Sequence, residues 1–309
     1  MYDKISTAEL TRTEWLRLRK TGIGGSDAGA ICGLNPYSSP MAVYRDKTSE
    51  EINEDDNEAM RQGRELEEYV ARRFCEATGK KVRRAKMMFR DKECPWMIAD
   101  IDRAVVGEDA ILECKTTNAF GADKWKDGHI PEHYLIQCYH YLAVTGKKAC
   151  YIAVVILGIG FLYQKIEREE EIIRDLRKVE ADFWNEHVVP KVMPTPDGSK
   201  ACDEVLEQYF GKSRKGSEIL LVGFDEKLKR HEELAELSKQ LETEKKQIEQ
   251  ELKLYMQDNE RAVSDGFRVS WVPVDSSRID TARLKEERPE VYKQFLKVSS
   301  SRRFQIRAA

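Results

Sequence analysis

A short apolar stretch that runs directly into charged residues constrains this chain more than any other feature. Ala110, Ile111 and Leu112 predict a buried strand, and Glu113 and Lys115 follow within the same stretch. Side chains alternate between the two faces of a strand, so Glu113 and Lys115 point the same way. Burying charge is costly unless the charge is paired or holds a metal ion. The stretch is therefore either an edge-strand salt bridge or part of a chemical site.

Apolar periodicity and turn signals on both sides of this stretch predict alternating strands and helices, as in a mixed α/β (α+β) domain. The helices alternate with the strands, so they are expected to flank a central sheet. Strands are expected at 82–90, 96–106, 110–116, 149–157 and 160–167, and helices at 7–20, 57–78, 131–146 and 168–188.

Composition divides the chain into three parts. Residues 1–190 contain the predicted strands and helices, and 191–217 form a linker region rich in Pro, Gly and Ser. Residues 218–309 form a C-terminal appendage with a long charged helix over 225–257 and a small β and helical part after it. The long helix has a heptad-like apolar seam, which favours a helical hairpin or a partner helix. Its members are Leu234, Leu237, Leu241, Ile248, Leu252 and Tyr255.

Charge and cysteine content exclude several classes of protein. The 52 basic and 55 acidic residues give a net charge of −3, which argues against coating nucleic acid through overall charge but allows a local basic groove. None of the seven cysteines forms a C-x-x-C pair, which disfavours a disulfide framework, a zinc ribbon and an iron–sulfur cluster. With neither a long apolar span nor a signal-peptide layout, we expect a cytoplasmic protein without membrane contact.

A second acid lies within reach of Glu113. Asp102 lies near the end of the strand before the turn at 107–109, and two antiparallel strands joined by this turn would place Asp102 beside Glu113. Two such carboxylates repel each other and raise each other's pKa unless a cation lies between them. Mg²⁺ prefers oxygen ligands, with Mn²⁺ as the alternative. Lys115 can then orient or help deprotonate a metal-bound water and stabilise the developing charge.

An acid followed by E-x-K on a strand pair resembles the PD-(D/E)XK nuclease pattern, and Gln137 and Tyr141, four apart on one helical face, resemble its RecB-type branch. Over about residues 10–190 the chain is more specifically similar to the YqaJ-like viral recombinase family. That resemblance implies the lambda exonuclease fold, a PD-(D/E)XK core with a central mixed β-sheet flanked by helices. The matching motifs are R-K-T-G-I-G-G-S-D-A at 19–28, G-x-x-x-E at 63–67, D-R at 102–103, E-C-K at 113–115 and Q-x-x-H-Y at 137–141.

The resemblance implies a role for each motif residue. Metal ions would be held by Glu67, Asp102, Glu113 and the backbone carbonyl of Cys114. Asp100 shares a predicted strand face with Asp102, so the identity of the metal ligand is open at this point, and the D-R pattern favours Asp102. Catalysis would rest on Glu67, Asp102, Glu113, Lys115, Gln137 and Tyr141.

The glycine-rich motif predicts an anion site, because a turn into a helix start offers free backbone N–H groups. Arg19 adds a fork suited to phosphate and Ser26 adds a hydroxyl. In lambda exonuclease an arginine and a serine at this spacing hold the 5′-terminal phosphate of the duplex, and the resemblance places Trp15 and Gln137 at the same DNA end. Asp100 stands where that enzyme has a serine. Either the phosphate pocket is built differently or Asp100 points away.

These expectations define an exonuclease that degrades one strand of duplex DNA from its end, 5′→3′, and leaves a 3′ overhang. The resemblance also implies a single-strand annealing (RecT-like) protein as partner and a homo-oligomer, a ring-shaped trimer in lambda exonuclease. One alternative is an endonuclease or repair nuclease of the same superfamily. The other is a non-catalytic adaptor that binds DNA ends and acts through the 225–257 helix.

Overall fold

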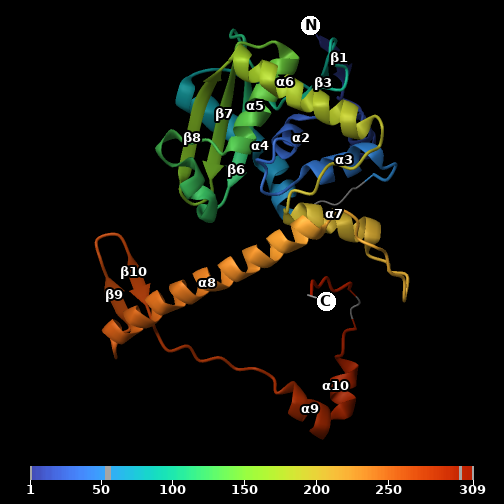
Figure 1. The fold of residues 1–309 in the computed structure, drawn as a ribbon. Coiled ribbons are helices and arrows are strands. Elements are labelled where there is room, and N and C mark those ends of the chain that lie inside the picture. Colours follow the sequence, from blue (N-terminus) through green and yellow to red (C-terminus); the bar gives the residue numbers. More distant parts are fainter. Residues whose placement is uncertain (1, 53–56, 299–300, 308–309) are drawn as a thin grey trace. The chain divides into compact units, whose positions relative to one another are not determined.

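The computed structural model describes residues 2–52, 57–298 and 301–307, and the chain divides into two compact units, 1–211 and 212–309 (Figure 1). The first unit contains all of the motif residues.

The centre of the first unit is a five-stranded mixed sheet. Its strand order is β2-β5-β6-β7-β8; β6 and β7 are parallel and the other neighbours antiparallel. The predicted central mixed sheet is confirmed. The strands are β2 (Val82–Arg84), β5 (Arg103–Val105), β6 (Ala110–Thr117), β7 (Ala149–Ile156) and β8 (Gly160–Glu167).

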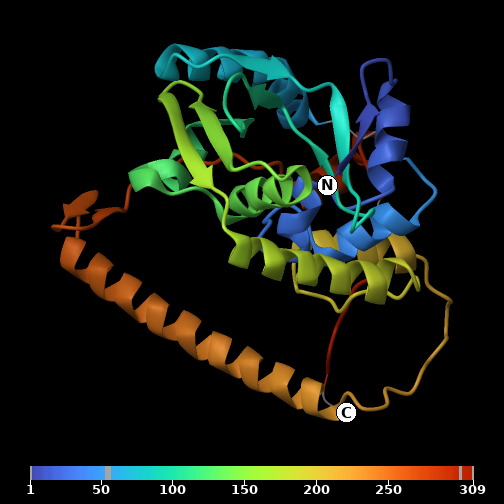
Figure 2. The ribbon, with the colours of Figure 1, turned by 90° about the horizontal axis from the view of Figure 1, so that it is seen from above.

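Helices cover both faces of this sheet (Figure 2). Helix α4 (Glu58–Thr78) packs Val70 and Phe74 against the face that carries Leu112. Helix α5 (Glu132–Thr145) packs against the opposite face, and α6 (Glu170–Phe183) lies outside α5. Every residue of β7 is consequently buried, which explains its uninterrupted apolar sequence.

A second, three-stranded sheet changes two of the predicted strands. Its antiparallel strands are β1 (Tyr2–Ser6), β3 (Met87–Asp91) and β4 (Ile98–Asp100). The segment 96–106, predicted as one strand, is β4 followed by β5 in the other sheet, and 82–90 divides in the same way into β2 and β3. Lys86, at φ 46°, lies at the second of these breaks. The chain passes from one sheet to the other at each break, which a local apolar pattern does not reveal.

Among the described residues, three short helices precede α4. Thr11 caps α1 (Arg12–Lys20) with a capping box to Glu14, and Ser39 caps α3 (Pro40–Thr48), which begins with proline. Between them, α2 (Gly25–Ile31) starts at the glycine-rich turn. Its capping residue is Gly24, with Asp27 bonded back to the Gly24 N–H, so neither Ser26 nor Asp27 is itself the N-cap.

The segment 191–217, predicted as a linker region, contains helix α7 (Lys200–Phe210). Cys202 and Val205 of α7 are buried in an apolar cluster with Met41 of α3. The first compact unit therefore extends to residue 211 rather than 190. The Pro and Gly residues before α7 favoured the interpretation of the whole segment as a linker, although residues 200–210 form an amphipathic helix.

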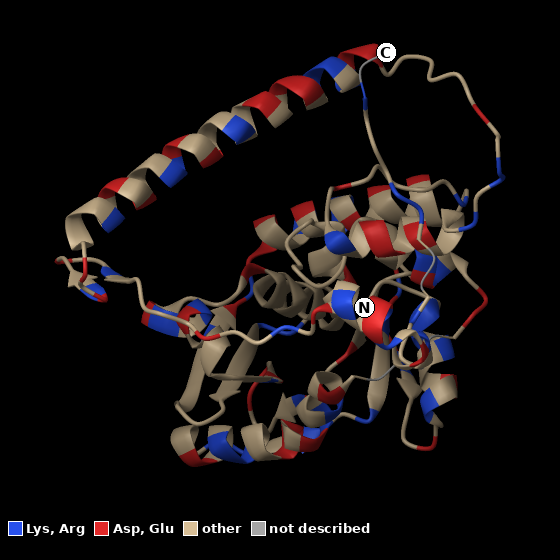
Figure 3. Ribbon diagram, turned by 90° about the horizontal axis from the view of Figure 1, so that it is seen from below, with Lys and Arg blue, Asp and Glu red and all other residues tan. Residues whose placement is uncertain are grey.

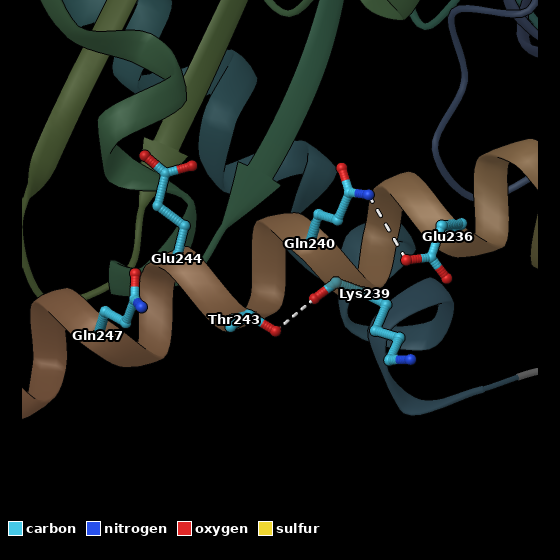
Figure 4. A pocket seen from close by; sticks show the side chains of 6 residues that line it. All are labelled: Glu236, Lys239, Gln240, Thr243, Glu244 and Gln247. Carbon is cyan, nitrogen blue, oxygen red and sulfur yellow. Dashed lines mark hydrogen bonds between the residues drawn. The ribbon is translucent and has the colours of Figure 1, made fainter.

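The second unit is built on helix α8 (Asp225–Met256), in which Met256 alone is buried among the described residues. The apolar seam is present, but its leucine and isoleucine side chains are 40–66% exposed. Acidic and basic residues alternate along α8 (Figure 3), and neighbouring turns of its polar surface are joined by hydrogen bonds such as Gln240 to Glu236 (Figure 4).

After α8 come the hairpin β9 (Arg261–Val263) and β10 (Arg268–Ser270), then α9 (Thr281–Glu287) and α10 (Pro289–Gln294). The helical part predicted after the long helix is thus two helices, interrupted at Pro289 because the residue before proline is disfavoured in the helical region. Among the residues that the structure describes, no helix is both long and apolar enough to cross a membrane.

Candidate active site

A cleft of about 690 Å³ in the first unit collects nearly all of the predicted site residues. Helices α1, α2, α4 and α5 contribute to its walls together with β4 and the middle of β6. The predicted residues that line the cleft are Trp15, Arg19, Ser26, Glu67, Asp100, Asp102, Glu113, Gln137 and Tyr141.

Asp102 and Glu113 meet where β5 pairs with β6. The antiparallel register joins Arg103 to Leu112, so the preceding Asp102 comes opposite Glu113. One Asp102 oxygen accepts a hydrogen bond from the Cys114 N–H at 2.7 Å. Burial, together with the charges of Glu113 and Glu67, raises the pKa of Asp102 well above its ordinary value. Burial also raises the pKa of Glu113, whose side chain is almost completely enclosed.

Lys115 provides the positive charge of this group. Its Nζ lies 2.7 Å from Glu113 Oε1, donates to Gln137 Oε1 at 3.0 Å and sits 4.5 Å from the centre of the Tyr134 ring. Burial alone would lower the pKa of Lys115, but the charges of Glu113, Tyr134 and Asp102 raise it above its ordinary value. Lys115 is therefore a protonated ammonium at neutral pH, suited to stabilising negative charge rather than to accepting a proton.

Gln137 and Tyr141 reach the same acid from helix α5. Gln137 Nε2 donates to Glu113 Oε1 at 2.7 Å and to the Tyr141 hydroxyl at 2.9 Å. The start of α2 packs directly on these side chains, because a Cβ atom built on Gly25 would lie 2.6 Å from Tyr141 Cε1. Glycine at position 25 thus allows the glycine-rich turn to approach Gln137 and Tyr141 closely.

Glu67 also lines the cleft, but its carboxylate is paired with Arg103. The Arg103 guanidinium contacts Glu67, donates to Glu68 at 3.0 Å and donates to the Asp102 carbonyl at 2.8 Å. The arginine is nearly completely buried. The D-R motif marked this position, but sequence reasoning assigned Arg103 no role.

The donor set fits a hard divalent cation at Asp102 and Glu113. Glu113 Oε2 is buried and has no hydrogen-bond partner among the described residues, and an orphaned carboxylate oxygen of this kind is a natural cation ligand. Within the described residues, no three His, Cys, Asp or Glu side chains are grouped to hold a metal. The third predicted carboxylate, Glu67, faces Arg103 instead.

The predicted end-binding residues adjoin the acids. Arg19 Nη2 donates to Ser26 Oγ at 3.0 Å, and the guanidinium lies 5.1 Å from the centre of the Trp15 ring. Trp15 Nε1 in turn donates to Asp100 Oδ2 at 2.7 Å. Burial raises the pKa of Asp100 above its ordinary value, against the opposing effects of Trp15 and Arg19.

Asp100 therefore faces the cleft and is held by Trp15. It ends β4, whereas Asp102 follows the break and pairs with the β6 backbone, so the expectation that the two acids share one strand face was wrong. The contact to Cys114 N–H and the proximity to Glu113 identify Asp102 as the acid beside the E-x-K strand.

A buried histidine–glutamate pair joins α5 to α6. His140 Nδ1 is 2.8 Å from Glu180 Oε1, and its Nε2 is 2.8 Å from the Ile98 carbonyl oxygen; both side chains are fully buried. His140 thus has a structural role, because it joins helix α5 to Glu180 and to the backbone at Ile98. The sequence did not indicate Glu180 as its partner. His133 contacts Tyr134, and burial, with nearby Lys115 and Lys124, lowers its pKa to about 4.

Comparison with known proteins agrees with the motifs. Residues 14–148 match the YqaJ-like viral recombinase domain. Over 304 residues the chain is 39% identical to the uncharacterized protein YqaJ of Bacillus subtilis (strain 168), which covers 97% of this chain and 95% of that protein. The chain belongs to the YqaJ-like viral recombinase family. The match to the Bacillus protein extends over nearly the whole chain, including the C-terminal unit of this YqaJ-family member.

Among solved structures, the alkaline exonuclease LHK-Exo from Laribacter hongkongensis in complex with dAMP is similar to the YqaJ-family chain with a TM-score of 0.51 and 20% identity. The match covers 63% of this chain and 96% of the other. At this identity the likeness shows the fold, and it confirms the predicted exonuclease-type α/β architecture.

Proposed function

We propose that this protein is a metal-dependent exonuclease that resects duplex DNA ends 5′→3′ and leaves a 3′ single-stranded overhang. The observation that carries the proposal is the meeting of Asp102 and Glu113 in one cleft with the Arg19–Ser26 pair, with Lys115 Nζ 2.7 Å from Glu113 Oε1. Membership of a viral recombinase family and the exonuclease-type fold support the same activity.

The hydrolytic centre is proposed to hold Mg²⁺, or Mn²⁺ as the alternative, through Asp102 and Glu113. The family resemblance adds the Cys114 carbonyl and Glu67, whose carboxylate would have to exchange its contact with Arg103 for the metal. A divalent cation at such a site lowers the pKa of a bound water and polarises the phosphoryl group. Lys115, held protonated, offsets the negative charge that develops on the phosphate. Gln137 and Tyr141 fix the orientation of Glu113 through the hydrogen bonds described above.

The polarity follows from the proposed end pocket. The Arg19 fork and the Ser26 hydroxyl are 3.0 Å apart and face the same cleft as the acids, so together they suit the oxygens of a terminal phosphate. Trp15 stacks under Arg19, and Gln137 links the pocket to the acids. A 5′-terminal phosphate held there presents the next phosphodiester to the hydrolytic centre.

Partners and assembly rest on the family resemblance. Resection exposes a strand on which a single-strand annealing (RecT-like) protein would load, which agrees with the recombinase description of the family. A ring-shaped homotrimer would hold duplex DNA in a channel lined by basic residues despite the net charge of −3. A cytoplasmic location remains a prediction of the sequence.

The test uses linear duplex DNA labelled on either strand, with and without 5′ phosphate, in Mg²⁺ or EDTA. We expect metal-dependent nucleotide release from the 5′ end, faster with the phosphate, and no cutting by Glu113→Ala although DNA ends are still bound. Cutting of closed circular duplex would favour the endonuclease alternative. End binding by the wild type without any cutting would favour the adaptor.

A further inference from the structure

The arginine of the proposed end pocket has a competing partner within its own chain. Asp27 Oδ1 lies 3.6 Å from Arg19 Nη2, on the guanidinium that also donates to Ser26. A carboxylate in this position competes with a phosphate for the same donors, because both bind guanidinium through paired oxygens. For Arg19 to bind a DNA end, the charge of Asp27 must be balanced elsewhere.

Lys47 on α3 balances the negative charge of Asp27. Its Nζ lies 2.8 Å from Asp27 Oδ2, closer than Arg19 is to the same carboxylate, and its side chain is fully buried. The ammonium also donates to the Arg19 carbonyl oxygen at 3.2 Å. Lys47 thus holds both the competing acid and the backbone of the arginine, in a buried position where charge interactions are weakly screened.

Asp27 is required by the turn itself. Its Oδ2 accepts the Gly24 N–H at 2.9 Å and so closes the glycine-rich turn at the start of α2. The turn brings Gly25 against Tyr141, so an oxygen that accepts the Gly24 N–H is needed at position 27 to keep the pocket wall in place. Because the natural residue is an aspartate, a second cation is needed to leave Arg19 available.

The charges around the pair support this division of roles. Asp46 contacts Lys47 at 3.0 Å and Lys20 at 3.3 Å. Within the direct ion-pair contacts, Arg19, Lys20 and Lys47 face the two carboxylates of Asp27 and Asp46, which leaves one positive charge in this group. Arg19 is the member that lines the cleft, so the surplus is available to a bound phosphate there. Removing Lys47 would leave this group neutral.

We propose that Lys47 is a positioning residue that determines specificity for 5′-phosphorylated DNA ends by neutralising Asp27, which otherwise competes for the Arg19 guanidinium. This inference rests on the proposed exonuclease function. Lys47 touches no substrate; it acts through Asp27 and Arg19.

The experiment compares wild type, Lys47→Met, Asp27→Asn and the Lys47→Met/Asp27→Asn double variant. The measured quantity is the ratio of kcat/KM for duplexes with 5′-phosphate and 5′-hydroxyl ends. Hydrogen bonds to charged groups correspond to a factor of about 10 to 100, so Lys47→Met should lower the ratio by about tenfold, mainly through KM. The double variant should restore it, because the uncompensated acid is gone. Lys147→Met, which breaks a surface pair to Asp109 of the same 2.8 Å length, is the matched control and should leave the ratio unchanged.

Binding of the same duplex ends, measured by fluorescence anisotropy in EDTA, is the second readout and does not depend on catalysis. Folding of each variant is checked by circular dichroism. An unchanged phosphate preference in folded Lys47→Met overturns the inference, and so does a loss that Asp27→Asn fails to restore, since that result indicates packing alone. Wild-type protein that binds phosphorylated ends preferentially but does not cut would refute the proposed function and leave the Lys47 comparison decisive.

Discussion

Divalent metal should stabilise this protein against heat, and the effect should depend on Glu113. The structure supplies the reason: Asp102 and Glu113 are buried together, the pKa of each is raised, and Glu113 Oε2 has no partner among the described residues. A ligand present at one hundred times its Kd stabilises the folded state by about 2.7 kcal/mol. In a folded unit of this size 1 kcal/mol shifts Tm by about 2–4 °C, so saturating Mg²⁺ should raise Tm by about 5–11 °C.

The assay is a thermal melt in EDTA and then in Mg²⁺ or Mn²⁺, without DNA, for wild type and Glu113→Gln. The variant keeps the size of the side chain but removes a ligand charge, so most of the metal-dependent shift should vanish. Glu76→Gln, an exposed acid on the same helix as Glu67, is the control and should respond like wild type. An equal metal shift in Glu113→Gln would refute the placement of the cation at this acid pair.

Three further changes test other parts of the structure. Burial alone would lower the pKa of His140, but Glu180 raises it. The pair therefore stabilises the fold fully below about pH 6.5 and loses this contribution as pH rises through the folded-state pKa of His140. The His140→Gln variant should show a flatter fall of Tm over that pH range, and an unchanged slope would contradict the pairing with Glu180. Asp100→Ser removes a negative charge from the cleft and should raise the preference for 5′-phosphorylated ends in the end-labelled assay, whereas a reduced preference would show that Trp15 depends on the acid. Gly25→Ala forces a Cβ atom onto Tyr141 and should cost about 1–3 kcal/mol in chemical denaturation, unlike the unobstructed Gly63→Ala.

The parts of the site that sequence reasoning brought together are those governed by local periodicity. Strand alternation places Glu113 and Lys115 on one face, and in the structure Lys115 Nζ lies 2.7 Å from Glu113 Oε1. Helical spacing places Gln137 and Tyr141 together, and they share a hydrogen bond. A short turn between antiparallel strands was sufficient to bring Asp102 opposite Glu113.

The residues that sequence reasoning missed are joined by long-range packing. Lys47 and Asp27 meet because α3 folds onto the start of α2, and His140 meets Glu180 across two helices. No spacing rule connects such positions. The division of 96–106 into β4 and β5 has the same origin: the apolar pattern is continuous, and only the neighbouring strands determine which sheet each half joins.

The acids in and around the cleft differ in how their charges are compensated. Arg103 holds Glu67 and Glu68 of α4 from strand β5, and Lys47 holds Asp27, so these acids already have buried cationic partners that fix helices and turns. Asp102 differs, because burial and the neighbouring charges of Glu113 and Glu67 hold its pKa well above the ordinary range. Since an added cation relieves that repulsion most at Asp102, the acid that the fold leaves least compensated is where metal binding would gain the most free energy.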